Sequence, residues 1–193
     1  MDQLADREYW IFIWEKFRKG DRRAFETIYN EYVNVLFSYG CRITDDRALL
    51  HDSIQDLFID IYTYSNSLRN PESLEFYLFK TLRNIIYRKL KEKNRFTHPE
   101  KIPEQFNLKF PVEETVIEDQ EENLMLLQKE VQNLDSKKRE LLFLKFNSGL
   151  TYNEMGKLLC INPDTAKKQV YRILKFLRGK LDKKIVGLFL MIR

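Results

Sequence analysis

Residues that build reactive centres are scarce in this chain of 193 residues, which contains two cysteines, two histidines and six glycines. Cys41 and Cys160 lie far apart and beside apolar residues, so we expect neither a disulfide framework nor a zinc site, as in a reducing compartment. His51 and His98 belong to no catalytic motif, and the sequence has no glycine-rich phosphate loop or nucleophile motif. The sequence therefore predicts no enzyme, no metal and no cofactor.

Long apolar runs and targeting patterns are also missing. The first ten residues, MDQLADREYW, lack the basic region and the apolar region of a signal peptide. The apolar stretch IVGLFLMIR is too short to cross a bilayer. We therefore expect a cytoplasmic protein that does not insert into a membrane.

What the sequence does contain is a series of segments with helical periodicity. Hydrophobic residues make up 44% of the chain, and few glycines and prolines interrupt the patterns. We predict an all-α fold with two small helical domains joined by a flexible linker. The first domain covers residues 1–97, the linker 98–123, and the second domain, which contains a helix-turn-helix, 124–193.

The linker is predicted from its composition. Three of the five prolines fall in it, and residues 100–122 carry eight acidic residues against two lysines. Since no apolar period survives there, we expect this stretch not to fold on its own.

Three helices are expected at the start of the first domain, over residues 1–19, 22 to about 41, and 46–64. Asp21 and Asp45 are the expected N-caps of the second and third helices. The second helix carries a broad apolar stripe, and residues at this spacing usually pack in a core. The stripe consists of Phe25, Ile28, Tyr29, Tyr32, Val33, Leu36 and Tyr39.

The third predicted helix has two unlike sides. Its inner stripe is formed by Leu50, Ile54, Leu57 and Ile61. Its other faces combine polar and apolar groups, namely Asp52, Gln55, Asp56 and Ile59. Such a surface can dock a protein, but the residues alone favour ordinary solvent exposure.

A fourth helix is expected over residues 72–95, with Pro71 near its first position. Leu78, Phe79, Leu82, Ile85 and Ile86 are its predicted inner stripe. Its outer face interleaves cations with amide and aromatic groups, namely Lys80, Asn84, Tyr87, Arg88, Lys91 and Arg95. That combination is typical of single-stranded DNA binding, although solvated cationic helices are common too.

A helix-turn-helix pattern occupies residues 150–178. Thr151 and Glu154 form a capping box for a short first helix, and Asn162 followed by Pro163 starts a longer second one. The second helix should bury Ala166, Val170, Ile173 and Leu177. Asp164, Thr165, Lys167, Lys168, Tyr171, Arg172 and Lys175 then face outward.

An ordinary helical hairpin with a solvated face would show the same pattern. The surrounding charge favours DNA, because residues 164–184 carry eight basic residues against two acidic ones. A cationic helix of this kind is suited to the major groove of duplex DNA.

Taken together, these strings resemble the extracytoplasmic-function (ECF) class of bacterial RNA polymerase sigma factors over nearly the whole chain. FETIYNEYVNVLFSYGCRI is similar to the opening helix of the family's first domain, and ALLHDSIQDLFIDIY to its polymerase-docking helix. EFYLFKTLRNIIYRKLKEKNR is similar to the promoter-melting helix. LDSKKRELLFLKFNSGLTYNEMGKLLCINPDTAKKQVYRILKFLR is similar to the second domain, which reads the upstream promoter element.

The resemblance implies core RNA polymerase and promoter DNA as partners, with an anti-sigma factor as a further partner. Implied polymerase contacts are Asp52, Gln55, Asp56, Phe58 and Ile59. Implied contacts to the minus-ten element are Arg83, Asn84, Tyr87, Arg88 and Lys91. Implied contacts to the minus-thirty-five element are Thr165, Lys167, Lys168, Tyr171 and Arg172.

One departure from the family bears on structure. Cys160 stands where the family usually has a turn glycine, so the turn must either avoid positive φ or be strained. Two other classes of function remain open from the residues themselves. A stand-alone helix-turn-helix regulator would have an effector-binding or dimerising first domain, and an RNA-binding adaptor would use the helix near residues 83–95 for structured RNA.

Overall fold

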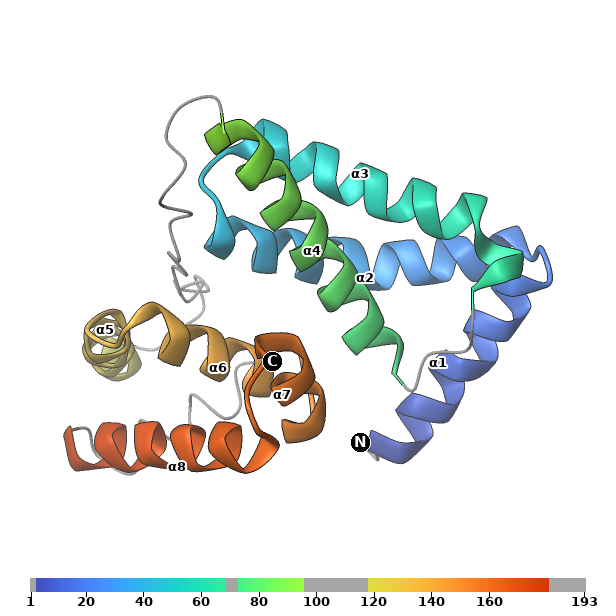
Figure 1. Ribbon diagram of the computed structural model, residues 1–193. Coiled ribbons are helices and arrows are strands. Elements are labelled where there is room, and N and C mark those ends of the chain that lie inside the picture. Colours follow the sequence, from blue (N-terminus) through green and yellow to red (C-terminus); the bar gives the residue numbers. More distant parts are fainter. Residues whose placement is uncertain (1–2, 69–72, 96–117, 181–193) are drawn as a thin grey trace. The chain divides into compact units, whose positions relative to one another are not determined.

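The computed structural model describes residues 3–68, 73–95 and 118–180 (Figure 1). Within these ranges all regular structure is helical, which confirms the predicted all-α class. The elements are α1 (Gln3–Arg18), α2 (Arg22–Ile43), α3 (Arg47–Thr63), the short 3₁₀ helix η1 (Ser65–Ser67), α4 (Leu74–Arg95), α5 (Glu118–Gln132), α6 (Ser136–Phe146), α7 (Tyr152–Leu159) and α8 (Pro163–Lys180).

The chain forms two compact units, Met1–Pro103 and Glu104–Arg193, and the boundary falls inside the predicted linker. The prediction that the linker extends to Asn123 is wrong at its end, because α5 begins at Glu118. Acidic residues are favourable in the first turns of a helix, where they face the positive end of the helix dipole. A composition that indicated a linker is therefore also compatible with a helix start.

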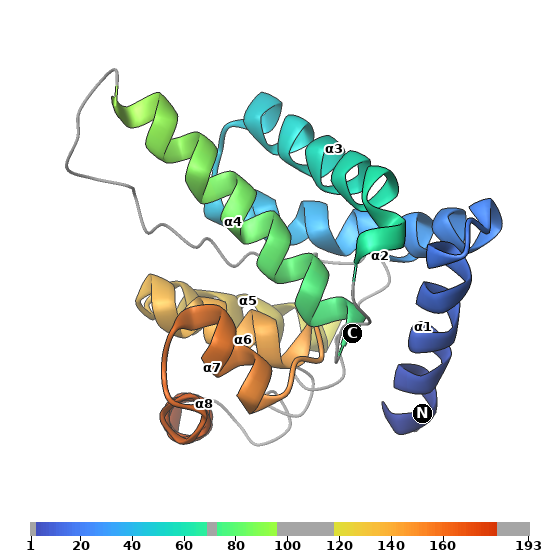
Figure 2. The same cartoon turned by 45° about the vertical axis from the view of Figure 1, so that its right-hand side comes forward.

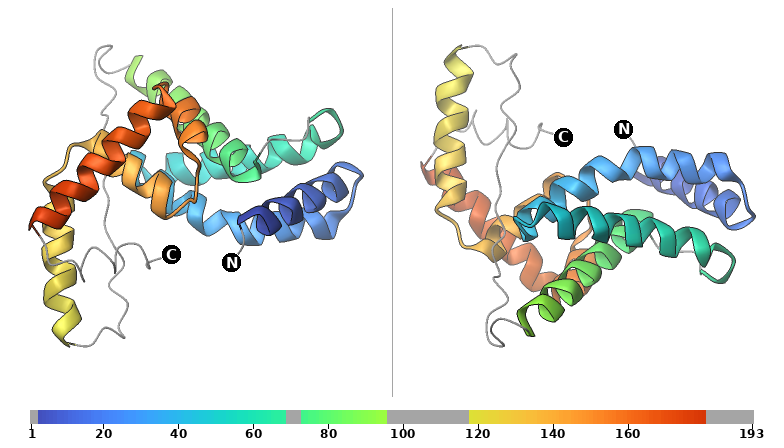
Figure 3. Two further views of the ribbon diagram at one scale, coloured as in Figure 1. Left: turned by 90° about the horizontal axis from the view of Figure 1, so that it is seen from below. Right: turned by 90° about the horizontal axis from the view of Figure 1, so that it is seen from above.

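In the first unit, α2 is the central helix. It packs against α1, α3 and α4, and the views in Figures 2 and 3 show α3 running beside α2. The unit's core contains large side chains that are fully buried, including Trp14, Leu36, Tyr39, Leu57 and Phe79. The rings of Tyr39 and Phe79 meet edge to face with centroids 5.0 Å apart, which joins α2 to α4.

The predicted inner stripes of α3 and α4 are buried throughout, as their helical spacing indicates. The start of α4 differs from the prediction, because the helix begins at Leu74 rather than Glu72. Ser73 precedes it, and its hydroxyl oxygen accepts a hydrogen bond from the Phe76 amide at 3.2 Å. Pro71 lies outside the described residues.

In the second unit, α6 packs against both α7 and α8. Because it is enclosed in this way, five successive residues from Glu140 to Leu144 are buried. Leu141, Leu142 and Leu144 are among them. Phe143 is the fully buried aromatic residue of α6, and Phe146 near its end is half-buried.

Aspartate side chains cap several helices, among them Asp21, which the sequence predicts. Asp21 accepts hydrogen bonds from the amides of Arg23 and Ala24, and Asp135 accepts one from the amide of Lys138. These bonds satisfy amides that have no partner within the helix.

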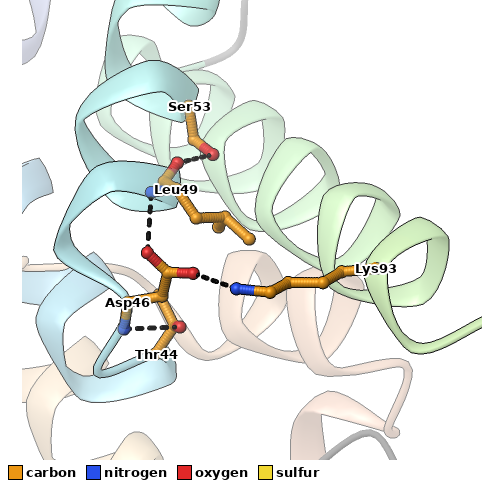
Figure 4. A network of polar contacts seen from close by, with 5 residues as sticks. All are labelled: Thr44, Asp46, Leu49, Ser53 and Lys93. Atoms are coloured by element: carbon orange, nitrogen blue, oxygen red, sulfur yellow. Dashed lines mark hydrogen bonds and ion pairs between the residues drawn. The ribbon is translucent and has the colours of Figure 1, made fainter. Parts of the chain in front are cut away.

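The N-cap of α3 is Asp46 and not Asp45, so that prediction is wrong by one residue. The Asp46 carboxylate accepts a hydrogen bond from the Leu49 amide at 3.0 Å, while the Asp46 amide donates to the Thr44 hydroxyl at 3.2 Å (Figure 4). The same carboxylate also receives the Lys93 amine of α4 at 2.6 Å. Lys93 and then the Leu49 amide hold the pKa of Asp46 below its ordinary value.

Asp46 should therefore contribute stability that depends on pH. A lowered pKa means that the folded state favours the carboxylate, so the stabilisation is present above the ordinary value of about 4 and is lost as the pH falls below it. Asp46→Asn keeps a capping oxygen but loses the charge. We expect it to lower the free energy of unfolding by up to about 1 kcal/mol at pH 7.

The measurement is urea unfolding followed by circular dichroism at pH 7 and near pH 3. The difference between wild type and Asp46→Asn should shrink at the lower pH. Asp45→Asn, the same substitution at the exposed neighbour, should have little effect at either pH. A difference that is independent of pH would contradict the ion pair.

Candidate docking and nucleic-acid surfaces

An open groove of about 1020 Å³ lies between α2 and α3. Its walls are aromatic: the Tyr29 and Phe58 rings lie 4.8 Å apart between centroids, and those of Phe25 and Tyr62 lie 5.1 Å apart. The rim carries polar groups, among them the side chain of Gln55. A concave surface of exposed aromatic groups with a polar rim is typical of a protein-binding site.

Two residues of this groove were missed or misplaced by sequence reasoning. Tyr29 was predicted to be a core residue, but it is 41% exposed, so that prediction is wrong. Tyr62 is 49% exposed and was not singled out. Helical spacing placed Tyr29 on the side of α2 that faces the other helices, but spacing cannot show that α2 and α3 leave this edge uncovered.

The predicted polymerase contacts on α3 divide into two groups. Gln55, Phe58 and Ile59 line the groove; Ile59 is 52% exposed, whereas Phe58 is buried at 5%. Asp52 is exposed but does not line the groove. Asp56 lies toward α4, where its carboxylate is 2.7 Å from the Lys89 amine.

The predicted minus-ten residues share α4 and fall on the side away from its buried stripe. Asn84, Arg88 and Lys91 are exposed. Arg83 and Tyr87 are half-buried, and the Arg83 guanidinium carbon lies 4.6 Å from the centre of the Tyr87 ring. This cation–π contact orients the ring beside the exposed amide and cations.

The predicted minus-thirty-five residues lie on one exposed surface of α8, which we call the α8 outer face. Thr165, Lys167, Lys168, Tyr171 and Arg172 are all exposed, Tyr171 by 66%. On the other side of the helix, the four predicted inner residues are all buried. The helix thus presents hydroxyl, phenol and cationic groups together to solvent.

The connection between α7 and α8 is short and tightly bonded. Thr151 and Glu154 form the predicted capping box of α7, and Asn162 accepts a hydrogen bond from the Asp164 amide at 2.8 Å to start α8. The backbone at Ile161 passes close to Gly156 of α7. A Cβ at position 156 would lie 2.8 Å from the Ile161 carbonyl oxygen, so a glycine is needed there. Cys160 has φ of 56°, in the left-handed region.

The turn therefore does not avoid positive φ, and Cys160, which has a Cβ, is strained in it. A residue with a Cβ costs about 1–2 kcal/mol in this conformation, whereas glycine adopts it freely but loses more chain entropy on folding. We expect Cys160→Gly to raise the free energy of unfolding by up to about 1 kcal/mol. Urea unfolding of the full chain measures this change.

Cys160→Ala is the matched control, because it removes the thiol and keeps the Cβ. It should give no gain in stability. If alanine stabilised the chain as much as glycine, the thiol rather than the backbone conformation would be responsible.

Comparisons with known proteins agree with this geometry. Residues 28–96, which run from within α2 to the end of α4, match the model for sigma-70 region 2. That segment is therefore similar to sigma-70 region 2. The sequence matches none of the curated proteins.

Solved sigma factors share the fold. The sigma factor RpoE, solved with the anti-sigma factor NepR from Bartonella quintana, aligns with a TM-score of 0.55 and 18% identity, over 87% of this chain and 97% of that one. CnrH, solved with the cytosolic domain of CnrY, aligns with a TM-score of 0.53 and 14% identity, over 88% and 94%. The match over residues 28–96 and the shared fold agree with the resemblance to sigma factors.

In the described part of the chain, none of the helices has the length and hydropathy needed to cross a membrane.

Proposed function

We propose that this chain is an ECF-type sigma factor, which binds core RNA polymerase in the cytoplasm, directs it to a small set of promoters and helps to melt the DNA. It acts by binding and positioning and carries out no chemistry of its own. The observation that carries the proposal is the sigma-70 region 2 match, because it covers most of α2 and all of α3 and α4, which form the α2–α3 groove and carry the cationic side of α4.

The α2–α3 groove is the proposed polymerase contact. It offers Ile59, Tyr29 and Tyr62 as exposed apolar and aromatic groups, with the side chain of Gln55 at its edge. Large apolar side chains in a recessed surface are the usual anchors of a protein–protein interface. Asp52, which is exposed on α3, adds a negative charge on the helix that forms one wall of the groove.

Two helices are proposed to contact the promoter in different ways. The exposed amide of Asn84 and the half-buried ring of Tyr87 suit unpaired bases of the minus-ten element, which bind by stacking and amide contacts. The α8 outer face suits duplex DNA at the minus-thirty-five element, where cations contact phosphates and base edges.

An anti-sigma factor is the proposed regulator of the chain. The proposal rests on the two solved neighbours: RpoE was solved with an anti-sigma factor and CnrH with the cytosolic domain of CnrY.

Co-elution with core RNA polymerase tests the proposed function. The purified full chain is mixed with core enzyme and separated by gel filtration, and we expect a stable complex of the two. A stand-alone helix-turn-helix regulator would elute apart from core enzyme and would form a two-fold dimer on palindromic DNA instead. Separate elution at micromolar concentrations would contradict the proposal.

A further inference from the structure

Aromatic and cationic side chains form a strip along one side of α1. Tyr9 and Phe12 are exposed by 49% and 53%. Lys16 is exposed, and its amine lies 4.6 Å from the centre of the Phe12 ring. Lys19, which directly follows the helix, is exposed as well. We call these four residues the α1 strip.

The strip follows from helical spacing. Steps of three, four and three residues keep its members on one side of the helix. On the other side, Trp14 and Phe17 are 0% and 2% exposed and belong to the core. Large exposed aromatic groups that lie together usually mark a binding surface.

The charge around the strip indicates a negatively charged partner. Residues 16–23 contain five basic residues, four of them exposed, and one acidic residue, Asp21. The Asp21 carboxylate accepts hydrogen bonds from the amides of Arg23 and Ala24, so it is engaged in capping α2. Proteins bind single-stranded nucleic acid with cations and exposed aromatic rings, because bases stack on the rings and cations contact the phosphates.

α1 packs against α4 (Figures 1 and 2), and a series of contacts joins the strip to the first turn of α4. The Tyr9 and Trp10 rings meet edge to face with centroids 5.1 Å apart, and the Trp10 and Tyr32 rings do so at 5.0 Å. The Tyr32 hydroxyl donates a hydrogen bond of 2.7 Å to the Glu75 carboxylate of α4. Asn84 lies nine positions after Glu75, or about 14 Å along α4. A DNA strand covers that length in about four nucleotides at duplex spacing.

We propose that the α1 strip binds single-stranded DNA next to the minus-ten element: Tyr9 and Phe12 stack on unpaired bases, and Lys16 and Lys19 contact phosphates. The strand that contacts Asn84 continues onto α1. This rests on the proposed function, and it extends the DNA surface of α4 to a helix outside the sigma-70 region 2 match, which begins at residue 28. Because stacking tolerates any base, α1 holds the opened strand without reading its sequence.

The test measures binding of the free full chain to a fluorescein-labelled oligo(dT) of about 20 nucleotides by fluorescence anisotropy. We expect Tyr9→Ala and Phe12→Ala each to weaken binding about five- to tenfold, because each removes one stacking contact. Phe12→Tyr should keep the affinity and Phe12→Leu should lose it, since only tyrosine retains an aromatic face. Lys16→Ala should make the slope of log affinity against log salt concentration shallower by about 0.7, as for one phosphate contact to a single strand.

Tyr29→Ala is the matched control, because it removes a tyrosine of similar exposure, 41%, from the α2–α3 groove. It should bind the oligonucleotide as tightly as wild type, and all variants should keep native circular dichroism. If Tyr9→Ala and Phe12→Ala also bound like wild type, or if Phe12→Leu bound as tightly as Phe12→Tyr, the proposal would be wrong. A wild-type chain that did not bind the oligonucleotide would overturn it as well.

A second experiment places the contact in the complex with core polymerase. Photo-cross-linking from 5-iodouracil in the opened strand should label peptides of α1 within about four nucleotides of the minus-ten contacts. Phe12→Ala should weaken this cross-link and leave core affinity unchanged. Lower core affinity of Phe12→Ala with unchanged oligonucleotide binding would make the strip a polymerase contact and overturn the proposal. A wild-type chain that bound the oligonucleotide but not core polymerase would overturn the proposed function alone.

Discussion

Arg172→Ala is expected to weaken binding of the polymerase complex to closed promoter duplex by at least about tenfold, because a side chain that contacts a base edge contributes about 1–3 kcal/mol. Arg172 is exposed on the α8 outer face, and the buried residues of α8 lie on its other side. The substitution should therefore leave the fold intact. Electrophoretic mobility shift on duplex that is kept closed at low temperature measures the effect.

Asn84→Ala should have the opposite profile. Asn84 is exposed on α4, and its amide is suited to an unpaired base rather than to duplex. We expect closed-complex formation to be preserved and opening to fall by about five- to tenfold. This is the effect of losing one base contact worth about 1 kcal/mol or slightly more. Permanganate reactivity of unpaired thymines reports the opening step.

The contrast between Arg172→Ala and Asn84→Ala is more informative than either effect alone, since misfolding would damage both steps. Lys137→Ala, at an exposed lysine of α6 that belongs to neither proposed set of DNA contacts, is the control for general loss of positive charge. It should leave both steps nearly unchanged. If Asn84→Ala abolished duplex binding while opening was intact, the two roles would be assigned the wrong way round.

Ile59→Lys is expected to reduce affinity for core polymerase by at least tenfold. Ile59 is 52% exposed and lines the α2–α3 groove, so a lysine there would bring a charge into the proposed apolar contact. Losses of 2 kcal/mol or more, about thirtyfold, are typical when the centre of an interface is disrupted. Fluorescence titration of labelled chain with core enzyme measures the affinity.

Tyr64→Lys is the matched control for Ile59→Lys. Tyr64 follows α3 directly and is 59% exposed, but it does not line the groove. It should bind core polymerase with nearly wild-type affinity, and both variants should keep native circular dichroism. Equal losses from the two substitutions would show that the effect is not specific to the groove.

Helical periodicity predicted much of the fold because it depends only on the repeat of apolar residues along one helix. The 4-3-4 spacing of Ala166, Val170, Ile173 and Leu177 predicted the buried side of α8, and all four are buried. The capping box of Thr151 and Glu154 predicted the start of α7, and both of its hydrogen bonds are present. Both features depend only on residues a few positions apart in the chain, so the local sequence is enough to predict them.

What the sequence could not predict depends on contacts between helices. Tyr29 belongs to the apolar stripe of α2 yet stays partly exposed, because α3 leaves one edge of that stripe uncovered. Asp56 and Asp52 were both predicted to lie on the polar side of α3, but within the described residues it is Asp56 that pairs with a lysine of α4. Neither periodicity nor charge pattern shows which residue of another helix lies opposite. The resemblance to a family gives both aspartates one role, and it does not show that Asp56 also pairs with Lys89.

The central claim is that this chain gives core RNA polymerase its promoter specificity. The most direct test is transcription in vitro with core polymerase freed of other sigma factors, on a library of promoter fragments, with the products mapped at their 5′ ends. Adding the chain should produce transcripts that start at defined positions on a small subset of fragments, and Asn84→Ala should reduce their yield. Transcripts with the same scattered start sites in its presence and absence would contradict the claim.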